Sequence, residues 1–305
     1  PGTHVKRLLE AVGEAGDRLV ELSRGRIDFD AAQALDRGSE LGLAPPGSIS
    51  PNGHCRLIRT SDSWIAVSLA RRDDIELLPA WLGVPLDTEP WESLLPAARF
   101  GEAPPLERPE LIDAGTRNAA ILDLSALWAG PYCGGLLAEA GHRVIKIESP
   151  DRPDPTAHHT PGLDVRINGR KERLSLALNG PELLSMIDGA RVMITSARPH
   201  ALARLGLDEE RVFARNPNLL WIAITAHGWR GDAAMRVGFG DDCAAAGSLL
   251  RWEDDRPLFI GDALADPLTG IMAATLAMEA LEGQKAGLLD IALARTAATF
   301  ARKMA

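Results

Sequence analysis

The sequence predicts an α/β fold built on a parallel sheet, because strand-like and helix-like segments alternate after residue 118. Short apolar runs typical of buried strands are separated by segments with helical spacing, and they cover residues 121–124, 144–147, 192–194 and 219–225. A strand, a helix and a second strand in such close succession form a βαβ unit, whose two strands lie parallel. Ligands of such sheets bind beyond the carboxyl ends of the strands, so we expect a site along that edge.

The other elements of this domain occupy the intervals between those strands. Ala129-Gly130-Pro131 is predicted to be a turn, followed by a helix of small and apolar residues from 132 to 140. A further strand is expected over residues 174–178. The remaining helices are expected over residues 181–188, 201–207 and 208–215.

The first part of the chain is predicted to be a smaller α+β domain with a helical N-terminus. Its expected elements, in order, are an amphipathic helix over 5–22, an Ala-rich helix over 28–41, a β-hairpin from Cys55 to Leu69 and a short helix over 75–82. A Pro-rich segment then separates this part from the strand at 121. We therefore divide the chain into two domains, residues 1–117 and residues 118–305.

Composition bounds the functional class. A chain of 305 residues with 46% hydrophobic and 25% charged residues can bury a sizeable core, and its net charge of −9 argues against a general nucleic-acid surface. No apolar run reaches the length of about 18 residues that a membrane span needs, and the N-terminus lacks the apolar core of a signal peptide. We expect a cytoplasmic protein that binds neither nucleic acid nor a membrane.

The sequence gives no sign of a metal or a standard nucleotide loop. Its three cysteines, Cys55, Cys133 and Cys243, are widely spaced and form no CxxC pattern, and the adjacent pair His158-His159 has no supporting ligands nearby. The phosphate-binding patterns GxxxxGK[ST] and GxGxxG and the GxSxG nucleophile pattern are also absent. The residues alone therefore indicate an enzyme or binding domain for a small molecule, without a metal.

Asp266 is the carboxylate to which the chemistry is assigned. Residues 258–260 are a short strand candidate, residues 261–265 form a small-residue turn, and Pro267 opens an apolar run with helical spacing. This pattern predicts that Asp266 is the N-cap of a helix with Pro267 at its first position, a cap that stabilises by roughly 1 kcal/mol. A purely structural cap and a reactive carboxylate are both compatible with the pattern, because a helix N-terminus keeps a carboxylate ionised.

Five stretches, in matching order and spacing over residues 119–300, resemble the class III CoA-transferases, the family of formyl-CoA transferase, carnitine CoA-transferase and α-methylacyl-CoA racemase. They are ILDLSALWAGPYCGGLLAEAGHRVIKIESP (121–150), RLSLALN (173–179), ARVMITSARPHALARLGL (190–207), ARNPNLLWIAITAHG (214–228) and ALADPLTGIMAATLAMEAL (263–281). The resemblance implies a Rossmann-like sheet domain, a smaller domain and a homodimer of interlocked chains. Residues 53–83 resemble the small-domain motif of that family, which indicates a rearranged member with this motif moved to the front.

The resemblance also assigns site residues. The family's nucleophile is an Asp four residues before a Gly, which matches Asp266 and Gly270, and it implies transfer of coenzyme A between an acyl-CoA and a carboxylic acid through an aspartyl-CoA thioester. The coenzyme A positions carried over are Leu127 and Trp128 beside the thioester and pantetheine, Leu178, Ser196, Ala197 and Arg198 beside the adenine and ribose, and Arg204 and Arg236 near the phosphates.

Alternatives remain open for these residues and for the activity. Trp128 is also compatible with plain core packing, Arg204 and Arg236 with solvated surface charges, and Asp241 and Asp242 with helix caps rather than an acyl pocket. A non-catalytic protein that binds acyl-CoA is the main alternative function, and an acyl-CoA hydrolase or racemase is another. The racemase is disfavoured because its required His is missing from VGFGDDCAAAG at 237–247.

Overall fold

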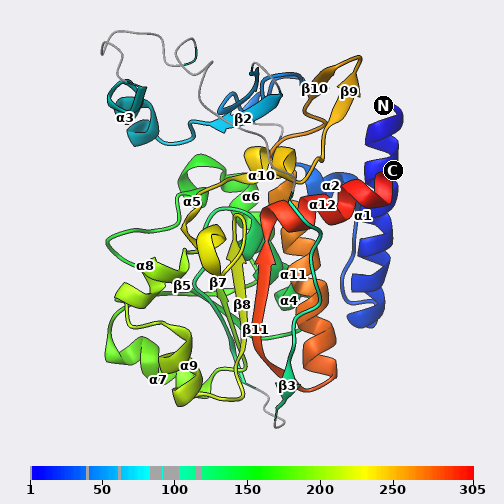
Figure 1. Ribbon diagram of the computed structural model, residues 1–305. Helices are drawn as coiled ribbons and strands as arrows, with labels where there is room; N and C mark the ends of the chain where they lie inside the picture. The colour runs from blue at the N-terminus through cyan, green and yellow to red at the C-terminus, as the bar shows by residue number, and fades with distance from the viewer. Residues whose placement is uncertain (1, 39–40, 61–62, 83–90, 92–102, 115–118) are drawn as a thin grey trace.

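A computed structural model describes residues 2–38, 41–60, 63–82, 91, 103–114 and 119–305. Within these ranges the main sheet has seven strands in the order β3-β11-β8-β7-β4-β5-β6 (Figure 1). Every neighbouring pair is parallel except β3 and β11, which are antiparallel. The predicted α/β fold with a parallel sheet is therefore confirmed.

The strand order reverses at the middle of the sheet. The strands are β3 (Ile112–Asp113), β4 (Ile121–Asp123), β5 (Val144–Glu148), β6 (Glu172–Ser175), β7 (Val192–Thr195), β8 (Leu220–Thr225) and β11 (Lys285–Ala292). From β4 the chain adds β5 and β6 on one side, and it then returns to add β7, β8 and β11 on the other. The loops after β4 and β7 thus leave in opposite directions, and such a point is where open α/β sheets bind their ligands.

Helices cover both faces of this sheet (Figure 1). The helices on one face are α1 (Thr3–Leu22), α4 (Ala129–Glu139), α11 (Ala265–Glu282) and α12 (Leu293–Met304), and those on the other are α7 (Pro181–Gly189), α8 (Pro199–Arg204) and α9 (Glu209–Arg215). Alternate residues of β8 serve the two cores: Leu220, Ile222 and Ile224 pack with α4 and α11, whereas Trp221 and Ala223 pack in the second core. Its first five residues are all apolar because both faces of the strand are buried.

Smaller elements lie above the carboxyl edge of the sheet (Figure 1). They are α2 (Ala31–Leu35), the antiparallel hairpin β1 (Cys55–Arg59) and β2 (Trp64–Ser68), α3 (Arg72–Leu82), α5 (Thr156–His159), α6 (Pro161–Asn168), the 3-10 helix η3 (Gly231–Met235), α10 (Gly240–Ala246), and the hairpin β9 (Arg251–Glu253) and β10 (Arg256–Leu258). The predicted β1–β2 hairpin is confirmed, and its tip at residues 61–62 lies outside the described residues.

Several predicted element boundaries were wrong. Ala129-Gly130-Pro131 is the first turn of α4 and not a separate turn, since a proline near a helix start has no amide hydrogen that needs a partner. The helix expected over 28–41 is only α2, whose N-cap Asp30 accepts a hydrogen bond from the Gln33 amide and which ends at the extended residue Asp36. The strand expected at 174–178 begins two residues earlier, as β6.

The N-terminal helices share a core with the sheet domain. Leu8, Val12 and Leu19 of α1 are buried in the same cluster as residues of α11 and α12. The amphipathic pattern of residues 5–22 therefore predicted α1 correctly, and the partner of its apolar face is the sheet domain. The boundary near residue 117 lies outside the described residues, and the division into two domains stays a prediction. No helix in the described part of the chain is long and apolar enough to cross a membrane.

Candidate active site

The loops after β4 and β7 are joined where the strand order reverses. The Ala126 amide donates a hydrogen bond of 3.0 Å to the Ser196 hydroxyl. Leu127 has a left-handed backbone (φ 71°), which a branched side chain rarely adopts. It is held there by two residues after β5: its amide donates to Asp154 Oδ1 at 3.2 Å, and its carbonyl accepts from the Thr156 hydroxyl at 3.1 Å. The structure thus brings the predicted positions Leu127 and Ser196 together.

Two buried ion pairs lie beneath this loop. Lys171 Nζ lies 2.7 Å from Asp123 Oδ2, and Lys146 Nζ lies 2.8 Å from Asp154 Oδ2, with almost no exposed surface on any of the four side chains. Burial raises the pKa of Asp123, but Lys171 and Lys146 outweigh that effect and the pKa lies below its ordinary value. The sequence interpretation missed both pairs, although a lysine inside the apolar strand VIKIE was a visible signal.

Asp266 lies in the first turn of α11, one residue inside the helix. The N-cap is Leu264 and no side chain caps this end, so the prediction that Asp266 is the N-cap was wrong. The helix starts earlier because the Asp266 amide already donates to the Ala263 carbonyl at 2.9 Å. The partly buried carboxylate lies against the start of α10: a Cβ on Gly240 would come within 2.3 Å of Asp266 Oδ2.

Gly270 has a packing role at the crossing of α11 and α4. A Cβ at this position would lie 2.9 Å from the Ala129 carbonyl oxygen and 2.9 Å from the Tyr132 ring. The absence of a side chain therefore lets α11 approach the first turn of α4 closely. This close approach places the Trp128 end of α4 beside the Asp266 end of α11, and Trp128 and Ala263 belong to one buried cluster.

Further polar residues surround Asp266. Asn52 donates to Asp241 Oδ2 at 2.6 Å and to Asp262 Oδ1 at 2.7 Å, and Arg37 Nη2 forms an ion pair of 2.6 Å with Asp262 Oδ2. Asp241 Oδ1 also accepts from the Ala263 amide at 2.7 Å. The sequence interpretation missed Arg37, Asn52 and Asp262. No local pattern marks Arg37 or Asn52, because their partners lie about 200 residues away in the chain.

Asp241 and Asp242 have different roles. Asp242 Oδ1 accepts from the Phe239 amide at 2.9 Å, so it stabilises the start of α10 as a cap does. Asp241 instead ties α10 to the turn before α11. The cap interpretation therefore holds for Asp242, and Asp241 is part of the polar network beside Asp266.

Burial and neighbouring charges keep Asp266 partly protonated. Burial raises its pKa to about 7; Arg37 opposes the rise, while Asp241, Asp262 and Asp242 add to it. Burial also raises the pKa of Asp242 to about 7. Near neutral pH, a substantial but incomplete fraction of Asp266 is therefore ionised, and carboxyl groups with such a raised pKa are common at functional sites.

This pKa predicts a pH-dependent stability. The folded-state pKa of Asp266 exceeds the ordinary value of 3.8, so between about pH 4 and 7 the unfolded chain releases this proton while the folded chain keeps it. The free energy of unfolding therefore falls as pH rises from about 4 to 7. Asparagine does not titrate, so Asp266→Asn protein does not lose this stability. We expect the variant to be more stable than the wild type by about 1–4 kcal/mol at pH 8 but by much less at pH 4.5. Urea unfolding at both values measures this, and equal differences at the two would contradict it.

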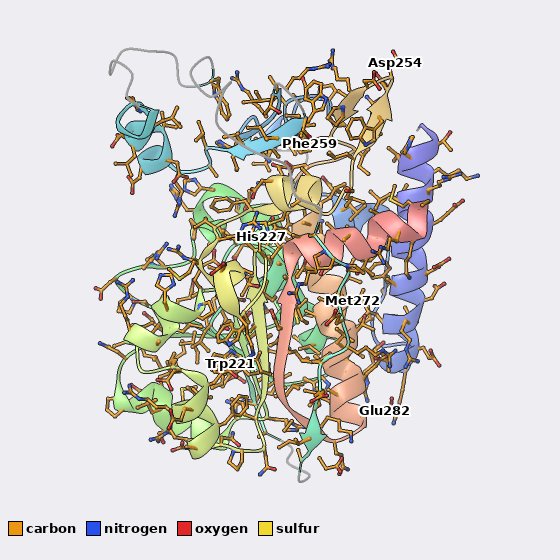
Figure 2. The ribbon with its side chains drawn as sticks, viewed as in Figure 1. Trp221, His227, Asp254, Phe259, Met272 and Glu282 are labelled. Carbon is orange, nitrogen blue, oxygen red and sulfur yellow. The ribbon has the colours of Figure 1, made fainter. Side chains whose placement is uncertain are left out.

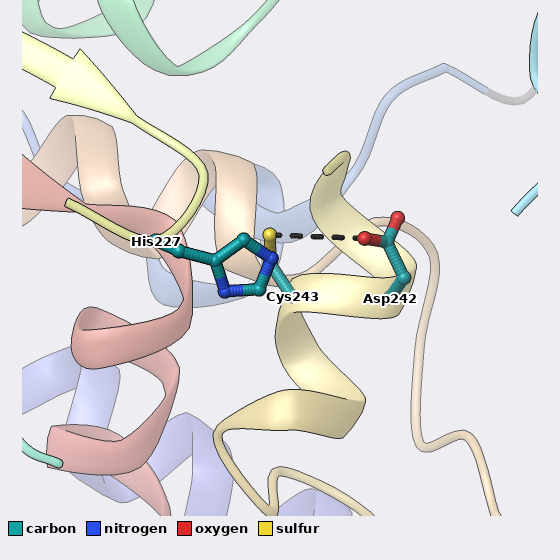
Figure 3. Close-up of side chains that lie close together, drawn as sticks. All are labelled: His227, Asp242 and Cys243. Carbon is teal, nitrogen blue, oxygen red and sulfur yellow. Dashed lines mark hydrogen bonds between the residues drawn. The ribbon is translucent and has the colours of Figure 1, made fainter. Parts of the chain in front are cut away.

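A second cluster lies next to Asp266. His227, which follows β8, lies with Asp242 and Cys243 of α10, and their possible ligand atoms are all within 4.8 Å of one another (Figure 3). Burial, helped by Arg236, lowers the pKa of His227 to about 4, so its ring is neutral. Burial raises the pKa of the Cys243 thiol well above its ordinary value, and that thiol donates to the Ala226 carbonyl at 3.5 Å.

To hold zinc, this set of side chains would need a cysteine thiolate. Burial of the Cys243 thiol and its hydrogen bond disfavour loss of the thiol proton. The absence of a metal therefore stays a prediction with a direct check. We expect dialysis against EDTA to leave the thermal unfolding midpoint and any CoA-transfer rate unchanged. A loss of either that added Zn²⁺ restores would contradict this expectation.

The other predicted coenzyme A positions lie along the carboxyl edge of the sheet. Leu178 is half-buried in the turn after β6, and Ser196, Ala197 and Arg198 form an exposed loop after β7. Arg204 ends α8 and Arg236 follows η3, and these two elements touch each other. Both arginines are exposed, and neither has an ion-pair partner among the described residues. Their roles in coenzyme A binding stay predictions.

Comparison with known proteins decides the family. A model of CoA-transferase family III matches residues 117–305, which is more than half of the chain. The chain belongs to CoA-transferase family III. This confirms the resemblance, and it covers the sheet domain with Asp266, Trp128 and the loops after β4 and β7, whereas Arg37 and Asn52 lie outside the matched residues.

Similar members of family III include named CoA-transferases. The chain is 31% identical over 185 residues to succinyl-CoA–D-citramalate CoA-transferase of Chloroflexus aurantiacus, which covers 56% of this chain and 46% of that protein. It is 30% identical over 185 residues to succinate–glutarate CoA-transferase of Agrobacterium fabrum, covering 53% and 45% of the two chains. The chain thus spans about half the length of the curated relatives it matches.

Solved structures support the fold of family III for this chain. A hypothetical protein of Mycobacterium tuberculosis matches with a TM-score of 0.53 and 26% identity, over 63% of this chain and 57% of the other. A CAIB/BAIF family protein from Brucella suis matches with a TM-score of 0.52 and 27% identity, over 62% and 55%.

Proposed function

We propose that the protein is an acyl-CoA:carboxylate CoA-transferase in which Asp266 carries the acyl group and then coenzyme A. The observation that supports this most is the position of Asp266 in a family III chain. Its partly buried carboxylate lies at the start of α11, beside the Leu127–Trp128 loop at the reversal of strand order. The names of two similar proteins, both CoA-transferases, agree with this reaction class.

The proposed reaction proceeds by covalent catalysis. An oxygen of ionised Asp266 attacks the donor thioester carbon, CoA thiolate leaves, and a mixed anhydride forms. The thiolate then attacks the Asp266 carbonyl carbon, which releases the donor carboxylate and leaves an aspartyl-CoA thioester. The acceptor carboxylate attacks this thioester, and the returned thiolate takes the acceptor acyl group and frees Asp266.

The described residues suggest how coenzyme A is held. We expect the loop with Ser196, Ala197 and Arg198, together with Leu178, to hold the adenosine, since these residues lie at the ends of β7 and β6. Arg204 and Arg236 are exposed cations on touching elements and suit the phosphates. Leu127 and Trp128 would then receive the pantetheine and thioester. We further propose that the working unit is a homodimer of interlocked chains.

A second candidate is an acyl-CoA-binding protein without turnover. One observation favours this candidate: Asp266 lines neither of two hollows in the described surface. One hollow is lined by Phe29, Tyr132 and Glu139, and the other by Trp64 and Trp252.

Trapping distinguishes the two candidates. The protein is incubated with succinyl-CoA, chosen from the name of a similar protein, and with other acyl-CoAs, then treated with hydroxylamine and digested for mass spectrometry. The transferase predicts a hydroxamate at Asp266 and isotope exchange between free acid and acyl-CoA. Binding of acyl-CoA with neither adduct nor exchange would overturn the transferase in favour of the binding protein.

A further inference from the structure

Two buried hydrogen-bond donors near Asp266 have no acceptor in the described part of the protein. They are Arg37 Nε and Trp128 Nε1, both fully shielded from solvent. The Arg37 guanidinium lies over the Trp128 ring, with Cζ at 5.4 Å from the ring centroid. A buried donor without an acceptor destabilises a protein by about 1–3 kcal/mol, so two such groups side by side indicate a place for a ligand oxygen.

Arg37 is fixed at one end of its guanidinium. Its Nη2 forms the 2.6 Å ion pair with Asp262, whose other oxygen accepts from Asn52. The planar guanidinium can donate along more than one edge at the same time. The ion pair therefore fixes the group while the Nε–H edge stays available.

Both donors lie close to the Asp266 carboxylate. Trp128, only 4% exposed, lies in the same buried cluster as Ala263, whose carbonyl accepts from the Asp266 amide. Arg37 is close enough for its charge to act on the Asp266 carboxyl group. We propose that the Arg37 Nε–H and Trp128 Nε1–H groups form the oxyanion site for the acyl group that Asp266 attacks, and that their ligand is the thioester carbonyl oxygen.

The site suits a developing oxyanion within the proposed transferase reaction, on which this inference rests. When Asp266 attacks the thioester carbon, the carbonyl π electrons move onto the oxygen, which accepts from the two N–H groups. The electrons return as the carbon–sulfur bond breaks and CoA thiolate leaves, so no proton is needed. Donors fixed beforehand stabilise such a charge without having to reorganise.

The surrounding charges favour a neutral carbonyl over a free carboxylate as the resting ligand. Asp241, Asp262 and Asp266 lie near Arg37, and the charges of Asp241, Asp242 and Asp262 all act on Asp266. A second carboxylate would be repelled by this group, because like charges in a poorly solvated site disfavour one another. A thioester brings an acceptor oxygen without a full charge at that point.

Binding can be tested without turnover, in Asp266→Asn protein labelled with ¹⁵N at its seven tryptophans. The Trp128 indole signal is the one missing from Trp128→Phe protein. We expect saturating succinyl-CoA to move it downfield, and the thioether analogue, in which a methylene replaces the thioester carbonyl, to leave it in place. Trp229, bonded to Glu209 at 2.6 Å, and Trp221, bonded to Thr195 at 2.9 Å, serve as internal controls. Equal shifts with both compounds, or none, would overturn the proposal.

Kinetics provide the second readout, in protein with Asp266 intact. We expect Arg37→Lys and Trp128→Phe each to lower kcat by about 10²-fold or more, with KM for the acyl-CoA changed by less than about threefold. The lysine keeps the charge near Asp262 but loses the Nε–H edge. Arg215→Lys is the matched control, because Arg215 also pairs with an Asp at 2.6 Å but on an exposed surface, and it should keep full activity.

The outcomes separate this proposal from the proposed function. If the wild type forms the Asp266 adduct but both variants keep the wild-type kcat, the oxyanion site is wrong and the transferase stands. If the thioester moves the Trp128 signal but no adduct forms, the donors bind the carbonyl and the transferase is wrong.

Discussion

Asp266→Asn protein is expected to lose CoA transfer by about 10³-fold or more and to give no hydroxylamine-trapped adduct. The amide keeps the shape of the side chain in the first turn of α11 but cannot form the mixed anhydride or the aspartyl-CoA thioester. A group that forms the covalent intermediate typically accounts for most of the rate, so little activity remains without it. The rate of label exchange between succinate and succinyl-CoA measures the effect.

A matched control separates chemistry from charge and folding. Asp254 lies at the tip of the β9–β10 hairpin, away from the site (Figure 2), and it is exposed. Asp254→Asn makes the same chemical change and should keep wild-type exchange. Exchange in Asp266→Asn protein within about tenfold of the wild type would show that Asp266 has only a packing role in α11, and it would overturn the proposed covalent mechanism.

The parallel sheet was predictable because its strands are buried on both faces. The run LLWIAIT is apolar up to its final Thr225, and in the structure successive side chains of β8 enter two different cores. Helix starts were less predictable. The Asp266-Pro267 pair suggested a helix beginning at Pro267, whereas α11 begins two residues earlier, at Ala265, where the Asp266 amide already donates to the Ala263 carbonyl.

Some residues of the candidate site lie in recognisable sequence motifs, and others do not. Asp266, Gly270 and the Leu127–Trp128 loop lie in stretches that resemble a family, so sequence comparison identifies them. Arg37 and Asn52 reach the same place from the N-terminal segment, through contacts with Asp262 and Asp241 that span most of the chain. A long-range polar contact leaves no periodic pattern in the sequence. Only the folded structure shows that Arg37 and Asn52 contribute to the candidate site.

Removing the Lys171 amine is expected to have the largest effect on stability. Lys171 Nζ donates to Asp123 Oδ2 at 2.7 Å, to the Pro131 carbonyl at 2.6 Å and to Asn168 Oδ1 at 2.7 Å, in the interior below the Leu127 loop. Lys171→Met leaves Asp123 buried without its main partner. Because an uncompensated buried charge is costly, we expect the free energy of unfolding to fall by about 3–5 kcal/mol, measured by urea unfolding at pH 7.

The neighbouring pair Arg143–Glu172 provides the control for this prediction. It has the same 2.7 Å separation and joins β6 to the chain before β5, but its side chains are 65% and 55% exposed. Arg143→Met should therefore cost no more than about 1 kcal/mol. The double variant Asp123→Leu/Lys171→Met should recover part of the stability lost in Lys171→Met, since both charges are then gone. Equal losses from Lys171→Met and Arg143→Met would contradict the argument, because burial is the property in which the two pairs differ most.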